Sequence, residues 1–403
     1  DPLLKKVGGI ITNKGGRTSH AAIVARELGV PAIVGCGNAT ESIKNGETIT
    51  MSCAQGKTGY VYEGKLSFDE REIDFSGIRM PRTEAKLILA DPENAFQLSF
   101  YPNNGVGLLR MEFIITHKVK VHPMALLKFD EIKDDTTRKE IEELTKNYPN
   151  KPSYFIDQLS QGIATIAAAF YPKEVIVRLS DFKTNEYANL IGGVDFEPEE
   201  ENPMLGFRGA SRYYNPLYKD GFALECAAIK RVRETMGLTN LKIMVPFCRT
   251  IKEGEKVLSV LAENGLNRGE NGLEIYTMVE IPSNVILAKE FAQIFDGFSI
   301  GSNDLTQLTL GIDRDSEIMG HLFDENDLAS KRMISMAIKS AKASDTKIGL
   351  CGQAPSDFPE FAQFLVDEGI DSISFNPDAL LQGIENINKG EKKRATSGMA
   401  ESR

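Results

Sequence analysis

Short apolar runs alternate with amphipathic stretches over most of the chain beyond residue 85. Eight of these runs have the length and the continuous apolar character of buried parallel strands, and helical patterns lie between most of them. They are residues 86–90, 106–110, 175–179, 243–247, 275–281, 298–302, 348–351 and 372–375. This alternation predicts an α/β fold, a TIM-type (β/α)8 barrel whose longest insertion lies at about residues 116–173.

The first 65 residues predict a smaller α/β unit. Ile10 and Ile11 end an apolar run, and a helix that Thr18 or Ser19 can cap extends to Leu28 and ends at Gly29. Residues 30–34 predict the next strand, and residues 41–62 alternate as in short strands and turns. The organisation we expect is a small domain at 1–65, a charged linker at 66–84, the barrel at 85–388 and a disordered polar tail at 389–403.

Composition narrows the classes of function. The chain has 403 residues, 41% of them apolar and 26% charged, with a net charge of −10, which does not indicate a nucleic-acid surface. The five cysteines show no paired spacing, and no apolar run approaches the ~18 residues of a membrane span. We therefore expect a cytoplasmic protein. The chain opens without a methionine, so we also expect it to be the C-terminal part of a longer protein.

Two carboxylates follow neighbouring predicted strands. Glu280 ends one apolar run, and Asp304 comes after the next, in the sequence Gly301-Ser302-Asn303-Asp304. The C-terminal ends of parallel strands meet at one edge, where ligands bind in such folds. Mg²⁺ prefers one or two carboxylates and leaves places for substrate oxygens. Glu280 and Asp304 are therefore candidate Mg²⁺ ligands, with solvated loop charges or helix caps as the alternative.

Arginines and a thiol accompany these carboxylates. Arg110 ends one predicted strand, and Arg178 lies near the end of the next. Arg208 and Arg314 lie in the loops beyond predicted strands. Arginine binds phosphate and carboxylate groups through two parallel hydrogen bonds, whereas a lone arginine at a strand end is usually a surface ion-pair partner. Cys351 lies between a strand and a Gly-Gln-Ala-Pro loop at the same edge, although a buried cysteine more often serves as a small apolar residue.

His20 lies in the first turn of the predicted N-terminal helix, after Gly15-Gly16-Arg17. Free backbone N–H groups, the helix dipole and Arg17 would favour a phosphate there. A neutral imidazole is a good phosphoryl acceptor. Polar surface is the alternative role for such a histidine.

Several motifs together resemble the PEP-utilising enzymes. GGRTSHAAIVARELG resembles the phosphohistidine signature of that family, and NPMLGFRGASRY, IMVPFCRT, MVEIPSN, GFSIGSNDLTQL, GIDRDS and LCGQAPSD resemble its barrel motifs. The resemblance covers nearly the whole chain except the tail. It implies a PEP/pyruvate-binding TIM-type barrel preceded by a phosphohistidine swivelling domain that is truncated at its N-terminus.

The resemblance also implies roles for particular residues. His20 matches the histidine that carries phosphate between sites, and Thr18 matches a threonine that a regulatory kinase modifies. Glu280 and Asp304 match the Mg²⁺ ligands, and Cys351 matches the proton donor and acceptor for the methyl carbon of pyruvate. The implied substrate-binding residues are Arg110, Arg178, Arg208, Glu280, Gly301, Ser302, Asn303, Asp304 and Arg314.

The motif sequences most resemble those of family members that convert ATP, pyruvate and water into AMP, phosphoenolpyruvate and phosphate. The alternatives are pyruvate phosphate dikinase and a phosphotransferase similar to bacterial enzyme I. The ATP-binding domain of the family is absent from this chain, so we expect only the phosphoenolpyruvate/pyruvate half-reaction from it. The resemblance further implies a homodimer. From composition, we expect no nucleic-acid or membrane partner.

Overall fold

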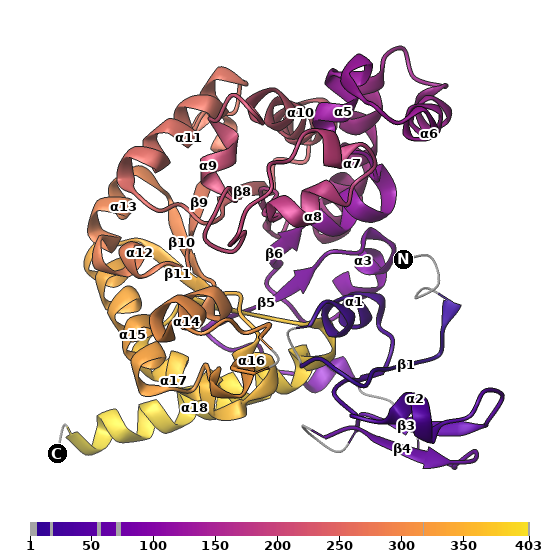
Figure 1. Ribbon diagram of the computed structural model, residues 1–403. Helices are drawn as coiled ribbons and strands as arrows, with labels where there is room; N and C mark the ends of the chain where they lie inside the picture. The colour runs from indigo at the N-terminus through magenta and orange to yellow at the C-terminus, as the bar shows by residue number, and fades with distance from the viewer. Residues whose placement is uncertain (1–5, 17–18, 55–57, 70–73, 317, 402–403) are drawn as a thin grey trace.

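Eight parallel strands close into a barrel, as the computed structural model shows in Figure 1. The structure describes all residues except 1–5, 17–18, 55–57, 70–73, 317 and 402–403. Around the barrel the strands are ordered β10-β11-β12-β5-β6-β7-β8-β9. They are β5 (Glu84–Leu89), β6 (Val106–Arg110), β7 (Val175–Arg178), β8 (Leu241–Val245), β9 (Ile275–Val279), β10 (Gly297–Ile300), β11 (Lys347–Leu350) and β12 (Ser372–Phe375). The predicted (β/α)8 barrel is confirmed.

Helices surround this barrel (Figure 1). The α-helices that follow the small domain are α3 (Ala95–Ser99), α4 (Met111–Ile114), α5 (Pro123–Leu127), α6 (Asp135–Thr145), α7 (Lys151–Phe170), α8 (Thr184–Ala188), α9 (Ala210–Tyr213), α10 (Lys219–Lys230), α11 (Ile251–Glu263), α12 (Pro282–Ile286), α13 (Ala288–Ile294), α14 (Ser302–Leu310), α15 (Leu328–Ala343), α16 (Ala354–Asp357), α17 (Pro359–Glu368) and α18 (Leu380–Glu401). The 3-10 turns are η2 (Phe75–Gly77), η3 (Pro92–Asn94), η5 (Phe129–Glu131), η6 (Gly193–Asp195), η8 (Glu270–Gly272), η9 (Gly320–Leu322) and η10 (Pro377–Ala379), and the π-helical turns are η4 (Ile115–Val119) and η7 (Arg231–Thr235). Within the described part of the chain, no helix combines the length and apolar character needed to cross a bilayer.

The strands are largely apolar because both of their faces are buried. Leu87 and Leu89 belong to the main core, whereas Ile88 belongs to a second cluster of buried side chains. Side chains alternate along a strand, so these two sets face opposite sides of the sheet. Strand ends differ from the prediction by one or two residues. In particular, β9 ends at Val279, which leaves Glu280 just beyond the strand.

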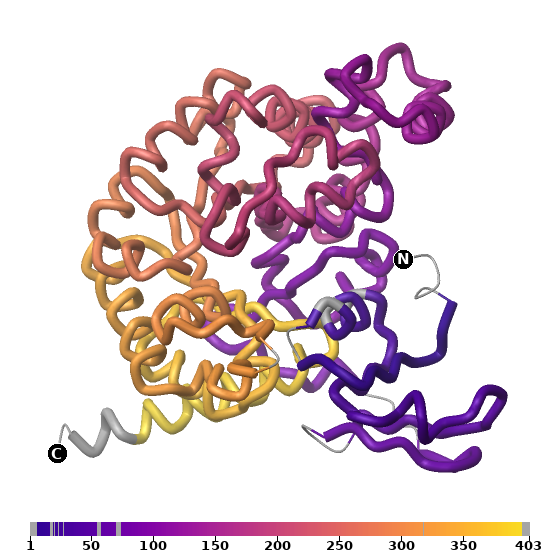
Figure 2. Tube along the Cα trace, in the orientation of Figure 1, coloured from indigo at the N-terminus to yellow at the C-terminus, as the bar shows by residue number. Residues whose placement is uncertain are grey.

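The small N-terminal unit is built from two short sheets and two helices. Strands β1 (Ile10–Ile11) and β2 (Ala32–Ile33) pair in parallel across α1 (His20–Leu28), and β3 (Ile49–Ser52) and β4 (Tyr60–Glu63) form an antiparallel pair after α2 (Ala39–Ser42). Figure 2 shows this unit, in indigo, beside the barrel. One ion pair between the two units joins Arg26 of α1 to Asp357 of α16 at 3.8 Å.

The C-terminal segment differs from the prediction of disorder. Helix α18 continues through it to Glu401. Leu380, Ile384 and Ile387 are buried at helical spacing and anchor the first part of the helix. Further along, the Arg394 guanidinium donates a hydrogen bond to the Val366 carbonyl of α17 at 2.9 Å. The polar sequence could not show this contact, because it depends on where α17 lies. The predicted domain boundaries themselves stay a prediction.

Candidate active site

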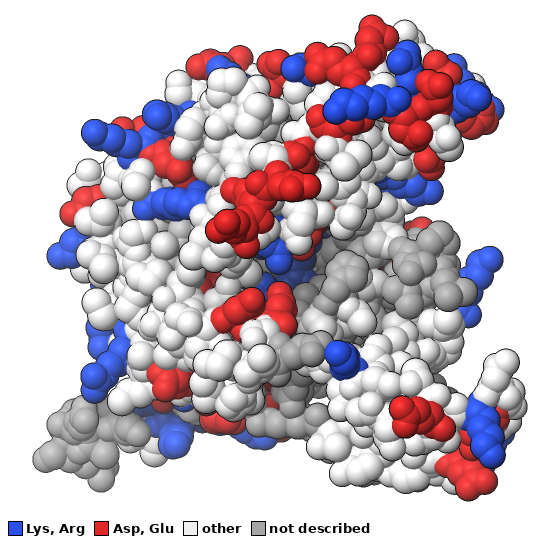
Figure 3. Space-filling model, in the orientation of Figure 1, with Lys and Arg blue, Asp and Glu red and all other residues white. Residues whose placement is uncertain are grey.

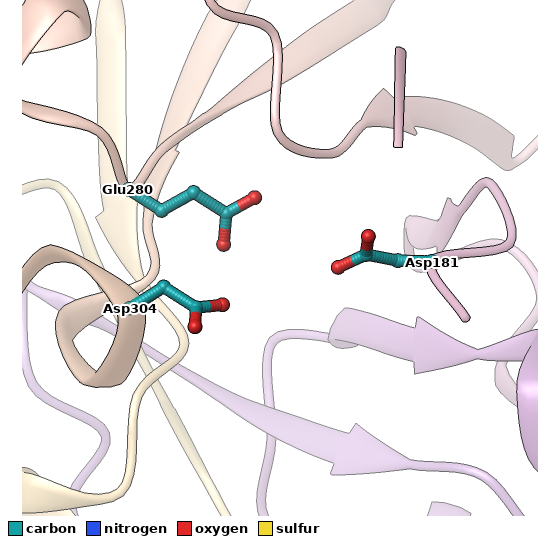
Figure 4. A group of neighbouring side chains, drawn as sticks. All are labelled: Asp181, Glu280 and Asp304. Carbon is teal, nitrogen blue, oxygen red and sulfur yellow. The ribbon is translucent and has the colours of Figure 1, made fainter. Parts of the chain in front are cut away.

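Three carboxylates meet at the C-terminal end of the barrel. Asp181 follows β7, Glu280 follows β9, and Asp304 lies in the first turn of α14, after β10. One carboxylate oxygen from each lies within 4.8 Å of the other two. Figure 4 shows the three groups pointing toward one another. All three are buried, so the cluster concentrates negative charge in a place where water screens it poorly.

The backbone around Glu280 fixes the direction of its carboxylate. The Asn284 side-chain oxygen accepts hydrogen bonds from the backbone N–H groups of Glu280 and Ile281, at 3.2 and 3.1 Å. The N–H group of Phe247 donates to Glu280 Oε1 at 2.7 Å. A Cβ atom at Gly301 would lie 2.7 Å from Glu280 Oε2. The absence of a side chain at Gly301 therefore leaves room for this carboxylate.

Arginines surround the cluster and partly neutralise it. Arg208 donates two hydrogen bonds to Asp181, from Nε at 3.1 Å and from a terminal nitrogen at 2.7 Å, and reaches Asp304 at 3.5 Å. Arg314 lies 3.7 Å from the other oxygen of Asp304. The Arg208 guanidinium also packs over the Phe247 ring, 4.1 Å from its centre. Arg208 is thus held by an acid on one side and an aromatic ring on another.

The electrostatics favour binding of a cation. Burial, together with the nearby Asp304 and Asp181 charges, raises the pKa of Glu280. Burial acts in the same direction on Asp304, but Arg314, Arg208 and Arg178 lower the pKa of this group overall. Glu280 Oε2 and Asp304 Oδ1 are buried without a hydrogen-bond partner. Unpartnered, converging carboxylate oxygens are the donor set that suits a hard divalent cation, so these residues fit such an ion.

Arg110 and Arg178 end adjacent strands at the same rim. They are paired in the register of β6 and β7. A terminal nitrogen of Arg178 donates to Glu112 at 3.0 Å, and the other lies 4.0 Å from Asp181. Figure 3 shows blue Lys or Arg atoms in the recess at the middle of the face that it draws. The paired register lets both guanidinium groups approach the same ligand.

Cys351 directly follows β11, and its thiol is nearly fully buried. Its Sγ atom accepts a hydrogen bond from the Ser299 hydroxyl at 3.1 Å. Burial raises the pKa of the thiol, while the hydrogen bond from Ser299 and the charges of Arg178 and Arg110 act in the opposite direction. The thiol is therefore held as a proton donor next to the positively charged part of the site.

The segment from Gly301 to Asp304 lines the same rim. The Ser302 hydroxyl donates a hydrogen bond to Glu325, and the Asn303 side-chain oxygen accepts one from the backbone N–H of Gln353 at 3.4 Å. The second bond joins the start of α14 to the loop that contains Cys351, and the first joins it to the segment before α15. The structure thus brings together the barrel residues that the sequence singled out.

Two predicted residues lie in the small N-terminal unit. His20 is the first residue of α1, after the N-cap residue Ser19, and Gly29 ends the helix in a left-handed conformation. This confirms the predicted helix. Thr18, the predicted regulatory residue, lies outside the described residues. The proposed roles of both residues stay predictions.

The sequence reasoning missed Asp181 and Phe247. Asp181 lies three residues beyond Arg178, after an apolar strand, which is the same signal that pointed to Glu280. Phe247 carries a backbone signal that the sequence does not show, a φ of 47°. A non-glycine residue in this region is strained, and such strain often occurs at functional sites. Here the strained residue, Phe247, is the one whose backbone N–H donates a hydrogen bond to Glu280.

Replacing Gly209 with alanine tests how closely this segment is packed. Gly209 has a φ of 58°, and an added Cβ would lie 2.6 Å from the Phe247 Cβ and 2.7 Å from the Pro246 carbonyl. We expect G209A to lose about 2–4 kcal/mol of stability, from strain and overpacking combined. The matched control is G237A, at a φ of 74° with open space around the added atom, which should lose only about 1–2 kcal/mol. Equal falls in Tm for the two variants would contradict the clash.

The fold and the site together indicate the class of protein. It is an enzyme-type (β/α)8 barrel with an acidic, arginine-lined site at the C-terminal ends of its strands. Comparison with known families then identifies residues 82–390 as the PEP-binding domain of PEP-utilising enzymes and residues 1–56 as the mobile domain of these enzymes. The chain belongs to the PEP-utilising enzyme family.

Similar curated proteins share high identity with the chain. It is 59% identical over 393 residues to a phosphoenolpyruvate synthase of Synechocystis, 56% identical over 438 aligned positions to one of Aquifex aeolicus, and 54% identical over 384 residues to one of Escherichia coli. These alignments cover 97%, 98% and 95% of the chain, but 48%, 51% and 48% of those proteins. The chain therefore spans about half the length of the curated relatives that it matches.

Proposed function

We propose that this chain carries out the phosphoenolpyruvate/pyruvate half-reaction of a phosphoenolpyruvate synthase. The observation that carries the proposal is the convergence of Glu280 and Asp304 beside Cys351. At the same rim, Arg178 forms ion pairs with Glu112 and Asp181. Identity to proteins named phosphoenolpyruvate synthase supports water, rather than phosphate or a protein, as the final phosphate acceptor of the full-length protein.

Glu280 and Asp304 would hold Mg²⁺ through their unpartnered oxygens. When bound, this ion supplies positive charge that stabilises the oxygens of an enolate. Arg110 and Arg178 would bind the carboxylate or phosphoryl group, because they project from paired positions of adjacent strands. Arg208 and Arg314 would spread the charge of the phosphoryl group. Gly301, Ser302 and Asn303 would line the substrate at the start of α14.

Cys351 would move the proton at the methyl carbon. In the direction from phosphoenolpyruvate, the thiol donates its proton to the methylene carbon while His20 accepts the phosphoryl group. In the direction towards phosphoenolpyruvate, the thiolate removes a methyl proton and the enolate oxygen attacks the phosphorus on His20. The small unit must bring His20 to the barrel mouth, and the linker after β4 would act as the hinge.

Other parts of the proposal concern the full-length protein. ATP would bind in a part of the protein outside this chain, and a kinase would regulate the enzyme at Thr18, where a phosphate would repel one on His20. A homodimer and a cytoplasmic location also stay predictions.

Replacing His20 with alanine should abolish phosphorylation of the chain. With Mg²⁺ and phosphoenolpyruvate labelled in its phosphoryl group, the unmodified chain should take up about one acid-labile phosphate per molecule and release an equal amount of pyruvate. The control is H321A, which changes an exposed histidine of η9 and should label normally. Undiminished labelling in H20A would contradict the assignment.

A further inference from the structure

The interior of the barrel is unevenly filled. On one side, the second buried cluster contributes large side chains from β5 to β9, namely Ile88, Leu108, Ile176, Met244, Tyr276 and Met278. On the other side, β10 to β12 contribute glycine and serine. A Cβ at Gly349 would lie 2.2 Å from the Ser372 hydroxyl, and one at Gly107, a small residue of β6 that faces β12, would lie 1.9 Å from the Ser374 hydroxyl. Barrel interiors are normally packed with bulky branched side chains, so small polar residues here need an explanation.

A cavity lies on the glycine- and serine-rich side. Its volume is about 30 Å³. Ser299 borders it in the middle of β10, Ser372 and Ser374 form part of its wall, and Glu84, Lys347 and Asp371 border it near the beginning of the strands. A buried water needs about 10–15 Å³ and two to four polar partners. The cavity therefore has room for about two waters, and its hydroxyl groups can hold them.

Ser299 contacts both this cavity and the thiol. Its hydroxyl donates the 3.1 Å hydrogen bond to Cys351 Sγ, and the same residue forms part of the cavity wall. The charged side chains near the thiol, Arg178, Arg110 and Glu280, belong to the mouth of the barrel instead. Ser299 is therefore the polar group that can pass a proton between the thiol and the cavity.

Two charged groups at the N-terminal end of the barrel, Lys86 and Glu174, are already paired with each other. Lys86, which lines the cavity, forms ion pairs with Glu84 at 2.9 Å and with Glu174. Burial alone would raise the pKa of Glu174, but Lys86 and Lys242 lower it to about 2. Glu174 therefore stays ionised at neutral pH, and hydroxyl groups and water are left as the proton carriers.

A second route to solvent matters because of the proposed reaction. The mouth of the barrel must be covered while His20 exchanges its phosphoryl group, since water would compete for it. The ion pair between Arg26 and Asp357 already joins α1 to α16, which begins three residues beyond Cys351. With the mouth covered, the thiol would have no access to solvent from that side.

We propose that Ser299 and this cavity form a proton path that connects Cys351 to solvent at the opposite, N-terminal end of the barrel. After the thiol gives its proton to the methylene carbon, the thiolate takes a proton from the Ser299 hydroxyl. Ser299 takes one from a cavity water, which is replenished from solvent. Each step breaks one bond to hydrogen and forms another, so no further reactant is needed. The inference rests on the proposed function for its purpose, but the path itself can be measured without turnover.

The first experiment follows the exchange of the Cys351 hydrogen directly. The protein, with Mg²⁺ and oxalate bound at the mouth, is mixed into D2O, and the infrared S–H band is followed in time, with C351S as the subtraction standard. We expect S299A to slow the exchange by about tenfold or more, because the positioned relay is lost. S299T keeps a hydroxyl and should restore the exchange.

A second variant removes a hydroxyl group from the cavity wall and leaves Ser299 and Cys351 unchanged. In G349A/S372A, a methyl group takes the place of the Ser372 hydroxyl in the cavity wall, and exchange should again slow. Exchange at the unmodified rate in S299A, with the fold verified by its Tm, would show that the proton enters through the mouth and would overturn the proposal. If S299A slows exchange but the unmodified chain releases no pyruvate from phosphoenolpyruvate, the proposed function fails while the path stands.

Discussion

Replacing Glu280 with glutamine is expected to abolish Mg²⁺ binding in the barrel and to lower the release of pyruvate from phosphoenolpyruvate by about 10³-fold or more. The amide keeps the shape of the side chain and can still accept the 2.7 Å hydrogen bond from the Phe247 N–H. The amide loses the charge, however. Its nitrogen would also take the place of Oε2, the Glu280 oxygen that accepts no hydrogen bond.

Calorimetric titration with Mg²⁺ measures this effect. D304N should behave in the same way, because Asp304 supplies the second unpartnered oxygen. The matched control is E253Q, which changes a buried acid on α11 that does not belong to the cluster and should bind Mg²⁺ normally. Full affinity in E280Q would remove the cation from this site.

The same titration should depend on pH in a defined direction. Burial and the neighbouring carboxylates raise the pKa of Glu280 in the free chain. A ligand carboxyl must lose its proton before it binds a metal. Mg²⁺ affinity should therefore rise with pH until Glu280 is ionised in the free chain, and binding below that pH should release protons. Titrations in buffers of different ionisation enthalpy measure this release.

How much of the site was predictable follows from where its residues lie in the fold. Glu280 and Asp304 follow strands that are consecutive in sequence and adjacent in the sheet, so their proximity can be read from the βα pattern alone. Asp181 reaches the same point from β7, which is separated from β9 by β8. That convergence depends on the curvature of the closed barrel, which no local pattern encodes.

The barrel as a whole was predictable because its strands are short, apolar on both faces and regularly separated by helical patterns. The left-handed conformation of Phe247 and the pairing of Ser299 with Gly349 in the register of β10 and β11 were not. The conformation of Phe247 is imposed by tertiary contacts. The pairing of Ser299 with Gly349 matters only through the packing inside the closed barrel, which the sequence does not show. The resemblance to a family supplied the proposed role of Cys351, because the residue itself looks like any buried thiol.

Replacing Cys351 with alanine is expected to abolish exchange of the pyruvate methyl hydrogens with solvent, with a loss of about 10²–10⁴-fold, the usual contribution of a positioned acid or base. Binding of phosphoenolpyruvate should change little, because Arg110, Arg178 and the carboxylate cluster remain. Deuterium incorporation into the methyl group, followed by NMR in D2O, measures the exchange. The control C248A removes another fully buried thiol, which belongs to the main core instead, so it should cost stability and leave exchange intact.

The role proposed for Cys351 also predicts that the rates of two reactions depend on pH in opposite directions. Burial raises the pKa of the thiol above its usual value, so Cys351 carries its proton at neutral pH in the free barrel. At Mg²⁺ concentrations that saturate the site at each pH, release of pyruvate from phosphoenolpyruvate needs that proton and should fall as the pH rises through the pKa of the thiol. The exchange reaction starts from the thiolate and should follow the opposite course. Undiminished exchange in C351A, or the same pH course for both reactions, would assign the proton to another group.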